Sequence, residues 1–531
     1  MATAIFFGAL VFYVVAGAVV ARRVKDSDDF YIMGGRGSTL LIVGTLAATY
    51  LSAVTMLGIA GQSYAMGPLV LVATGSFGAW IGTILAVLYV GRRMKALGCR
   101  TMPDFFKARF NNTAVTTIAT IIMIVGLLGY GVIQLIGAGL VLSEITGIGF
   151  PLMIVIFTLA LLVFAALGGM YGVVVTDTLM FFTMLAVAVV IAPLIIAQAG
   201  FAQMRGLSES LPGYWTLAGT EGMTLGFTFS QFLVWIIFFT CMPALVSRVF
   251  PARNDFVILK AAIIGVFFAP LMQVLVFLAA GAMQVLNPGI EDVDRVMVVG
   301  FLEYVPPVLS GVGLAALMAA IMSTASTLFV LTGFGLSRDL YENLRGGGQM
   351  TEQRRLLVSR FAQVIVAAVV CAIAIARPSA IYWIAIYAGA IFGVGWLPTV
   401  VAGLEWRRMN AQAALSSMIV GVTSFVTITE LEGQGTISLP LFFDPLMVSF
   451  TLSIAALVIA ALLTRPNRYE TEYFEQMKDT SASAETIKSF LSRPDGLARL
   501  KREYRQIHII AGCFIVLSIV IWGFFFVNLG L

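Results

Sequence analysis

Long apolar segments, each close to the length of a membrane-crossing helix, follow one another through almost the whole sequence. A helix needs about 20 apolar residues to cross the roughly 30 Å hydrocarbon core of a bilayer. Of the 531 residues, 60% are apolar and only 11% are charged, too few to cover a water-exposed surface. The chain is therefore predicted to be an all-α polytopic membrane protein. The fourteen segments that meet the length rule are 4–21, 38–66, 69–90, 114–142, 150–170, 173–198, 222–247, 256–285, 304–336, 356–376, 379–403, 410–430, 443–463 and 507–529.

The distribution of Lys and Arg predicts which side of the membrane each loop faces. With the N-terminus outside, 29 of the 32 basic residues fall on the cytoplasmic side, and only Arg205, Arg295 and Arg377 fall outside. Arg248 is counted here in a cytoplasmic loop. The segment 4–21 is predicted to be a retained helix, because its basic residues follow the apolar run, whereas a secretory signal has them first. Both the N-terminus and the C-terminus are then expected outside a plasma membrane of the bacterial inner-membrane type.

Cysteine and histidine usage argues against metal and redox chemistry. The four cysteines have no paired spacing and His508 is the single histidine, so neither a disulfide framework nor a metal cluster is predicted. A membrane-embedded enzyme would need acids or histidines converging near an interface, and the spans do not offer them. The net charge of +5 is spread over short runs between spans, which argues against a nucleic-acid ligand. We predict no enzyme activity, no organic cofactor and no obligate protein partner; the expected partners are a small organic solute and membrane lipid.

Asp177, in GGMYGVVVTDTLM, is the one carboxylate that lies well inside a predicted span. Ionisable groups in the membrane are costly and are functional candidates by default. The alternative is a polar group near the cytoplasmic boundary that caps a helix or forms a local hydrogen bond. A carboxylate at this depth can also carry a proton, so a proton-coupled carrier stays open.

A set of hydroxyl groups in AALMAAIMSTASTLF is a second candidate for ion binding. Ala320, Ser323, Thr324 and Thr327 fall on one helix face, and Ser326 lies beside it. Hard cations such as sodium prefer oxygen ligands, which hydroxyls and freed carbonyls supply. The alternative is that these hydroxyls bond back to carbonyls or join neighbouring helices.

The second apolar segment is expected to be a broken helix, because Gly58, Gly61 and Gly67 interrupt it together with several polar residues. Unwound backbone at bilayer depth survives only where protein covers it or where it lines a site. Transporters use such breaks to direct carbonyls and helix ends at solute and ions. Pro243 is expected to kink the seventh segment as well.

The two interrupted segments each begin a group of five spans, which is the placement expected of an inverted repeat. We therefore divide the chain as follows: an extra N-terminal helix and loop, 1–37; a first five-helix repeat, 38–198; an external loop, 199–221; a second five-helix repeat, 222–403; and three C-terminal helices, 404–531, with a charged cytoplasmic stretch at 464–506.

At these positions the sequence resembles the sodium/solute symporter family. The resemblance covers nearly the whole chain, and the motifs that carry it are AAIMSTAST followed by SRDLY, GGMYGVVVTD, AATYLSAVTMLGIAGQSYAMG and TMPDFFKARF. It implies a LeuT-type core of five plus five helices. It also implies sodium as the coupling ion, with movement by alternating access.

The resemblance also implies ligands for sodium. The main sodium site corresponds to Ala48, Leu51, Ala320, Ser323 and Thr324. Some members hold a second sodium, and the matching residues here are Asp177, Ser323, Ser326 and Thr327.

The expected solute is a small organic molecule, with a monocarboxylate, an amino acid or a related small acid as the best interpretation. Sugar carriers have polar amide and charged groups where this chain has Thr55, Trp235 and Val266, and few polar groups cannot satisfy the hydroxyls of a sugar. An acid would place its carboxylate at a half-helix N-terminus rather than on an arginine. Phe238 lies where an inner aromatic gate would be, although plain helix packing explains Trp235 and Phe238 equally well. The predicted substrate-binding residues are Thr49, Ser52, Thr55, Trp235 and Phe238.

The predicted mechanism is sodium-coupled import, in which sodium binds first from outside and joins the broken helix to the hydroxyl-bearing helix. Two rivals stay open at this point besides proton coupling through Asp177. They are a channel and a substrate-sensing receptor built on the same scaffold.

Overall fold

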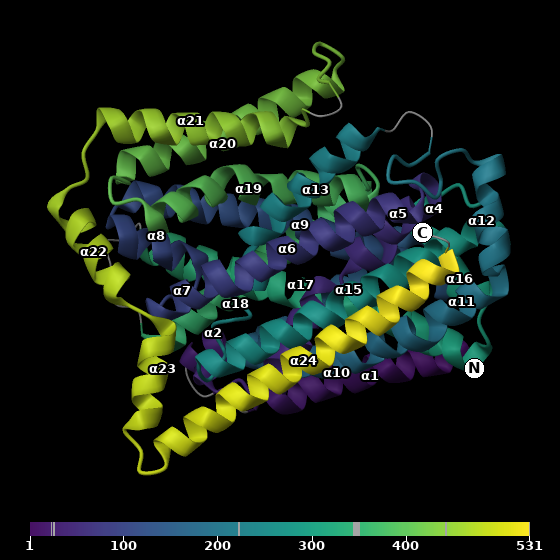
Figure 1. Ribbon diagram of the computed structural model, residues 1–531, viewed down its shortest axis with the longest axis horizontal. Helices are drawn as coiled ribbons and strands as arrows, with labels where there is room; N and C mark the ends of the chain where they lie inside the picture. Colours follow the sequence, from purple (N-terminus) through teal and green to yellow (C-terminus); the bar gives the residue numbers. More distant parts are fainter. Residues whose placement is uncertain (23, 25–26, 221–223, 344–350, 441–442, 530–531) are drawn as a thin grey trace.

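The computed structural model describes residues 1–22, 24, 27–220, 224–343, 351–440 and 443–529. Helices form nearly all of this part of the chain, and Figure 1 shows most of them running side by side along the long axis of the molecule. The described residues contain no β-strand, and one isolated bridge joins Gly37 and Ala252. The expected all-α class is confirmed.

The N-terminal part contains the first predicted repeat. Its elements are α1 (Ala2–Ala21), α2 (Ser27–Ile32), η1 (Met33–Gly35), α3 (Thr39–Tyr50), η2 (Val54–Ile59), α4 (Ala60–Met66), α5 (Pro68–Leu71), η3 (Val72–Gly78), α6 (Ala79–Ile84), η4 (Leu85–Gly91), α7 (Arg92–Ala96), α8 (Met102–Phe110), α9 (Thr113–Thr146), α10 (Phe150–Ala186), η5 (Val187–Ile191), α11 (Ala192–Ala199) and α12 (Phe201–Ser210).

The second predicted repeat and the C-terminal helices follow. Their elements are α13 (Leu225–Thr240), α14 (Pro243–Val246), α15 (Asp255–Leu286), η6 (Val293–Arg295), α16 (Val296–Glu303), α17 (Pro307–Phe334), η7 (Gly335–Glu342), α18 (Glu352–Ala376), α19 (Ile381–Glu405), α20 (Ala411–Gly433), α21 (Pro445–Leu463), α22 (Arg468–Asp479), α23 (Ala482–Leu491) and α24 (Gly496–Leu529). The boundary predicted between 221 and 222 lies outside the described residues.

Eleven helices in the described residues are long and apolar enough to cross a membrane. The pair Thr39–Tyr50 and Val54–Met66 passes the same test as one span bent by 49°. Two shorter apolar helices, Phe150–Leu162 and Leu225–Thr240, lie where the fifth and seventh spans are predicted. A multi-pass membrane protein is confirmed, whereas the number of fourteen crossings and the inverted repeat stay predictions.

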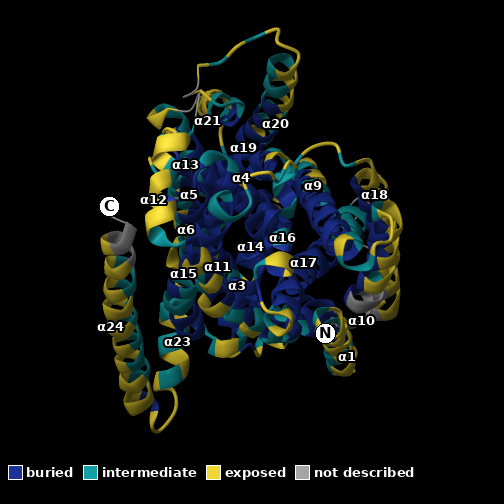
Figure 2. Cartoon of the chain, turned by 90° about the vertical axis from the view of Figure 1, so that its right-hand side faces the viewer, coloured by how far each residue is buried: buried dark blue, intermediate teal, exposed yellow. Residues whose placement is uncertain are grey.

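The middle of the molecule is formed by helices that are buried on almost every side. Figure 2 shows buried residues around α3, α4, α14 and α17, and exposed residues on the outer faces of α1, α18 and α24. The most apolar window of α17 is wholly buried, whereas that of α24 is fully outside the core. An apolar surface on α24 is compatible with lipid as its solvent.

Glycine allows α3 and α10 to approach each other closely. A Cβ atom on Gly44 would lie 2.7 Å from the Cα atom of Thr178, so a larger residue would separate the two helices. Within α10, Gly169 has φ 51° and ψ −155°, and this non-helical residue bends the long helix at the GGMYG motif. The bend separates the apolar segments predicted as the fifth and sixth spans.

The charged stretch 464–506 forms short helices at one end of the molecule. Figure 1 shows α22 and α23 at the end opposite to both chain termini, and α24 returning along α15. Helix α24 begins at Gly496, eleven residues before the apolar span predicted to start at 507, because the basic and apolar halves form one continuous helix. The α22 helix is fastened to the core by Arg109 of the TMPDFFKARF motif, whose guanidinium donates to the carbonyl oxygens of Gly403 and Glu470, each at 2.9 Å.

Candidate functional site

The predicted break in the second apolar segment is present between α3 and η2. Leu51 has extended backbone angles, φ −90° and ψ 105°, which end α3. The Ala53 N–H donates to Gln134 Oε1 at 3.1 Å instead of to a helical carbonyl. Among the described residues, no backbone N–H beyond the break donates a helical hydrogen bond to the carbonyl oxygen of Ala48 or Leu51. The two carbonyl groups predicted to bind sodium therefore lie at the break, where the helix does not use them as acceptors.

The second break lies between α13 and α14, at Cys241 and Met242. Pro243 begins α14 and cannot donate a backbone hydrogen bond into α13, so the predicted kink is confirmed. The turns after α14 bring Arg248 into the middle of the protein, where its side chain is completely buried.

The hydroxyl-bearing face of α17 is buried, and its members differ in how their hydroxyls are satisfied. Ser326 Oγ and Thr327 Oγ1 donate to the Ser323 carbonyl oxygen, at 3.1 and 2.9 Å. Ser323 Oγ and Thr324 Oγ1 make no hydrogen bond of standard geometry to any described residue. Buried polar atoms in native structures almost always have a partner. The back-bonding alternative therefore explains Ser326 and Thr327 but leaves two oxygens ready for another ligand.

Asp177 lies opposite this face and forms a buried ion pair. Its Oδ2 atom is 3.0 Å from Arg248 Nη2, and both side chains have no exposed surface. Thr45 Oγ1 donates to the same carboxylate oxygen at 2.6 Å. The Ser323 hydroxyl lies within hydrogen-bonding reach of the Asp177 carboxyl group, although neither Ser323 Oγ nor Asp177 Oδ1 makes a hydrogen bond of standard geometry among the described residues.

Arg248 is the main correction to the sequence interpretation, which counted it in a cytoplasmic loop. Its Nε donates to Thr49 Oγ1 at 2.7 Å, and one of its terminal nitrogens donates to Thr327. A buried carboxylate needs a counter-charge, and the arginine supplies it from a distant part of the chain. The available signal was the apolar surrounding PALVSRVF, which has too few polar residues for a solvated loop.

Thr49 and Thr327 belong to this ion pair in the present conformation. Thr49 was predicted to bind substrate, but its hydroxyl donates to the Thr45 carbonyl at 2.7 Å and accepts from Arg248. Thr327 was a predicted ligand of the second sodium, and it also bonds to Arg248. The structure thus brings α3, α10, α17 and the segment after α14 together around one buried guanidinium.

The remaining predicted substrate residues gather in a different cluster, farther along the broken helix. Trp235 and Phe238 stack with ring centroids 5.5 Å apart, and the Tyr130 ring lies 6.0 Å from Phe238. The Tyr130 hydroxyl is 3.2 Å from Ser52 Oγ, and that oxygen accepts from the Val54 N–H. Ser52, Trp235 and Phe238 are therefore brought together by Tyr130, which the sequence interpretation did not single out.

Two buried amides beside the broken helix were also missed. Gln273 Nε2 of α15 donates to Thr55 Oγ1 at 3.2 Å, and Gln134 of α9 accepts from the break itself. Each keeps one unpartnered buried atom, Oε1 of Gln273 and Nε2 of Gln134. The indole N–H of Trp235 also makes no hydrogen bond of standard geometry. Glutamine in an apolar helix was the available signal, but only the fold shows that both face the break.

Val266 does not join this cluster. It is half-buried and lines a small apolar crevice with Ala47, Tyr50 and Trp80. Gln273 from the same helix does lie beside Thr55, so the broken helix has a buried amide next to it that the sequence analysis did not include.

The outer half of the broken helix is covered by other segments. A Cβ atom on Gly61 would lie 2.3 Å from the Val293 carbonyl oxygen, and one on Gly58 would lie 2.7 Å from Ile381 Cγ2. The glycines therefore let η6 and the start of α19 close over α4. Every predicted site residue is buried in this conformation.

Two interrupted helices around a buried polar site define a membrane carrier with a LeuT-type fold. A solved Na⁺-coupled sialic acid symporter has the same fold, with a TM-score of 0.73 and 20% sequence identity, over 88% of this chain and 98% of that one. The sequence model of the sodium:solute symporter family matches residues 31–421 of this chain. The chain belongs to this family, and it is a transporter rather than an enzyme.

Curated relatives agree with that assignment over most of their length. The sodium/pantothenate symporter of Escherichia coli is 27% identical over 83% of this chain and 92% of its own. An osmoregulated proline transporter of Bacillus subtilis is 23% identical over 86% of this chain and 94% of its own. Sodium-coupled transport of a small organic solute is the function that these similarities support.

Proposed function

We propose that the protein is a secondary active symporter that imports a small organic acid together with sodium, by alternating access. The observation that carries the proposal is that Ser323 and Thr324, whose hydroxyls do not bond back to their own helix, lie on α17 against α3, whose carbonyls are released at Leu51. Uncharged oxygens from two separate elements suit a weakly held alkali cation that must be released again. The repeats are proposed to be 38–198 and 222–403, with both termini outside.

A sodium ion can drive concentrative uptake through the membrane potential and through its own concentration gradient. One net positive charge that crosses a potential of 100 mV contributes about 2.3 kcal/mol, which supports roughly fiftyfold accumulation of a solute without net charge, such as a zwitterionic amino acid. A monocarboxylate anion cancels the charge of one sodium ion, so its uptake with a single ion is driven by the sodium concentration gradient, and a second ion would add the potential.

We propose that the coupling sodium ion binds at the main site, which consists of Ala48, Leu51, Ala320, Ser323 and Thr324. A second sodium ion would bind only in a conformation in which the Asp177–Arg248 ion pair is open. The carboxylate oxygen that a second ion would need is already 3.0 Å from the guanidinium. A sodium ion and an arginine at the same oxygen would repel each other in a low-dielectric surrounding. The second site with Asp177, Ser323, Ser326 and Thr327 thus competes with an internal cation.

The chemistry around the broken helix favours a small acid with further polar groups. At the N-terminal end of η2, the Ala53 N–H donates to Gln134 Oε1 and the Val54 N–H donates to Ser52 Oγ. A substrate carboxylate would replace these two acceptor oxygens at the positive end of the helix. The unpartnered atoms of Gln134 and Gln273 can then bond to the rest of the solute. Pantothenate and proline, for which the relatives are named, are both small acids.

An uptake panel tests the proposed function. Proteoliposomes that contain the protein are given labelled pantothenate, proline, lactate or glucose, under an inward sodium gradient or an equal potassium gradient. We expect sodium-dependent accumulation of at least one acid, by roughly tenfold or more, and no accumulation of glucose. Counterflow of the accumulated acid separates a carrier from a channel or a receptor. Equal uptake in sodium and potassium would remove the proposal.

Gln273 is expected to contribute to solute affinity. The variant Gln273→Met lacks the amide next to Thr55. Its apparent KM for the accepted solute should be about tenfold higher, because a tenfold change corresponds to about 1.4 kcal/mol, close to the net free energy of one hydrogen bond. The matched control is Gln363→Met, which changes a buried glutamine on α18 that is not part of the broken-helix cluster. Equal KM values for the two variants would show that Gln273 has only a packing role.

Proton coupling through Asp177 is the second candidate, because this membrane-embedded carboxylate has one oxygen without a hydrogen-bond partner. Uptake in sodium-free medium under an imposed pH gradient tests it. Accumulation under those conditions, lost in Asp177→Asn, would favour the proton.

A further inference from the structure

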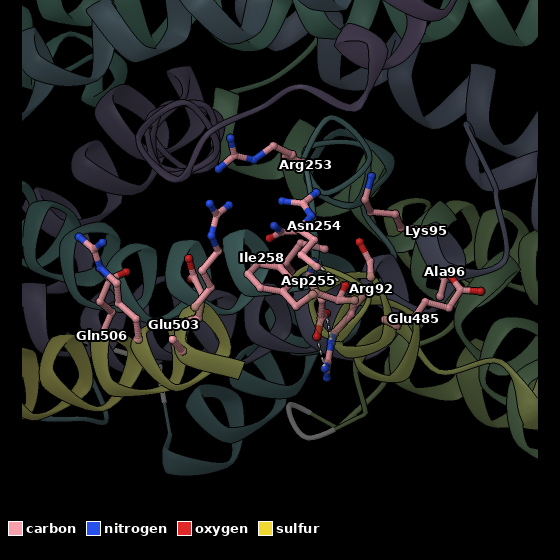
Figure 3. A pocket seen from close by; sticks show the side chains of 18 of the residues that line it. Arg92, Lys95, Ala96, Arg253, Asn254, Asp255, Ile258, Glu485, Glu503 and Gln506 are labelled. Atoms are coloured by element: carbon pink, nitrogen blue, oxygen red, sulfur yellow. Dashed lines mark hydrogen bonds and ion pairs between the residues drawn. The ribbon is translucent and has the colours of Figure 1, made fainter. Parts of the chain in front are cut away.

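A cavity of about 1050 Å³ lies far from the broken helices, between the start of α15 and the hairpin formed by α23 and α24. Figure 3 shows Arg253 and Lys95 on the side of the core, with Glu503 and Gln506 on the side of α24. The cavity lies at the end of the molecule where the charged stretch 464–506 forms its helices. The apolar part of α24 follows directly after it, so the cavity borders the membrane surface.

The acidic side chains that line this cavity are mostly neutralised by their own partners. Asp255 accepts from Arg92 at 2.5 and 2.7 Å. The Glu503 carboxylate is 2.6 Å from Lys260 Nζ. Asp495 pairs with Arg499 within α24 and the turn before it. These three acids therefore contribute little net negative charge to the cavity.

The remaining lining residues leave an excess of positive charge. The guanidinium groups of Arg253, Arg493 and Arg502 have no hydrogen-bonded or ion-paired partner in the described part of the chain, and that of Arg493 lies 6.0 Å from the centre of the Phe490 ring. Among the lining acids of the described residues, Glu485 forms no ion pair. The Lys95 ammonium donates to the Phe250 carbonyl at 2.6 Å and keeps two further donors. Four cations from the core and the hairpin thus surround a space that a headgroup-sized anion would fill.

We propose that this cavity binds a phosphate-bearing anion that joins the α23–α24 hairpin to the transport core. Arginine guanidinium groups bind phosphate oxygens in pairs, and Arg253 would do so from the core while Arg493 and Arg502 do so from the hairpin. The phosphate comes from one of two sources, the headgroup of an anionic lipid or a soluble phosphate compound. The lipid source has the advantage of position, because anionic lipids concentrate at the cytoplasmic membrane surface.

The contacts between the α23–α24 hairpin and the core indicate that such an anion would stabilise the docked hairpin. The hairpin is already attached to the core by Ser483, which donates to Asp255 at 3.0 Å, and by the Phe256 ring, which packs against Phe490 and Tyr504. Unpaired like charges on both sides of the cavity oppose this attachment. A phosphate between them would convert the repulsion into a bridge and stabilise the docked hairpin.

The test uses the full-length protein in lipid nanodiscs. Its melting temperature and its bound lipids, the latter by native mass spectrometry, are measured in phosphatidylcholine and in phosphatidylcholine with phosphatidylglycerol. Inorganic phosphate is titrated into the phosphatidylcholine sample as the soluble probe. We expect one of the two anions to raise the melting temperature by several degrees. An effect of phosphatidylglycerol alone identifies the lipid as the source, and an equal effect of inorganic phosphate identifies a soluble compound.

A matched pair of variants separates this cavity from general surface charge. Arg253→Gln/Arg502→Gln removes two lining cations, whereas Lys501→Gln/Arg505→Gln removes two exposed cations of α24 that do not line it. The first variant should bind the effective anion at least tenfold more weakly, while its melting temperature in phosphatidylcholine alone should equal or slightly exceed that of the wild type, because less positive charge is repelled across the cavity. The second variant should behave as wild type. The same loss in both variants, or no response of the wild type to either anion, would overturn the proposal.

Discussion

The double variant Ser323→Ala/Thr324→Ala is expected to lose sodium-stimulated uptake completely. The two hydroxyls are buried oxygens of α17 that make no hydrogen bond of standard geometry, and Asp177 keeps its bonds to Thr45 and Arg248 when Ser323 is replaced, so their removal costs the folded protein little. They are, however, the two side-chain ligands proposed for the main sodium site. A cation that loses two of about five oxygen ligands in an apolar surrounding loses several kcal/mol of binding free energy, more than 100-fold in affinity.

The measurement is initial uptake of the accepted solute in proteoliposomes as a function of sodium concentration. The control is Thr332→Val/Ser337→Ala on the same helical segment. Its two hydroxyls donate to helix carbonyls at 2.6 and 2.7 Å and are not proposed ligands. The control should keep its sodium dependence. Unchanged sodium stimulation in the Ser323/Thr324 variant would disprove the site.

Arg248→Gln is expected to destabilise the protein more than any other single change considered. It leaves the Asp177 carboxylate in the interior without its cation, and the loss of one partner of a buried ion pair costs about 3–5 kcal/mol. The folded fraction should fall strongly, together with uptake. Thr49 and Thr327 lose the same donor at the same time.

A double-mutant cycle checks the physical reason for that loss. Asp177→Asn/Arg248→Gln removes both charges and should recover much of the stability that each single variant loses, because neutral amides can bond to each other and to Thr45. The readouts are the melting temperature and the monodisperse fraction in detergent. A single Arg248→Gln variant as stable as wild type, or a double variant no better than the singles, contradicts the assigned ion pair.

Local features of the sequence predicted the scaffold of the transport site. The glycines predicted to interrupt the second segment are not at its break. The chain leaves the helix at Leu51, whereas Gly58 and Gly61 lie inside the helical run of η2 and α4, where α19 and η6 pack directly on their backbone. Pro243 predicted the second break for a reason internal to the helix, its missing N–H. The spacing of Ser323 and Thr324 placed them on a common face, but it did not distinguish them from Ser326 and Thr327, which bond to their own helix.

The interior partners of the site did not follow from the sequence. Gln134 lies 81 positions from Ala53, and Gln273 lies 218 positions from Thr55. Each polar residue has many possible partners in a chain of this length, so composition and period do not select among them. Arg248 was assigned to a loop because a positive charge near a span end is usually solvated, and the counter-charge of Asp177 was not considered.

By itself the sequence determined a helical membrane carrier with two interrupted helices and the oxygen-rich face of α17. Segment length, helical period and the missing N–H of Pro243 act locally and account for the membrane class, the α17 face and the second break, whereas the first break, at Leu51, does not lie at a glycine. Only the tertiary structure decided that Arg248 neutralises Asp177, that glutamines line the break, and that the α23–α24 hairpin encloses a basic cavity. Those outcomes depend on which distant side chains share a space from which water is excluded, and this is settled by packing.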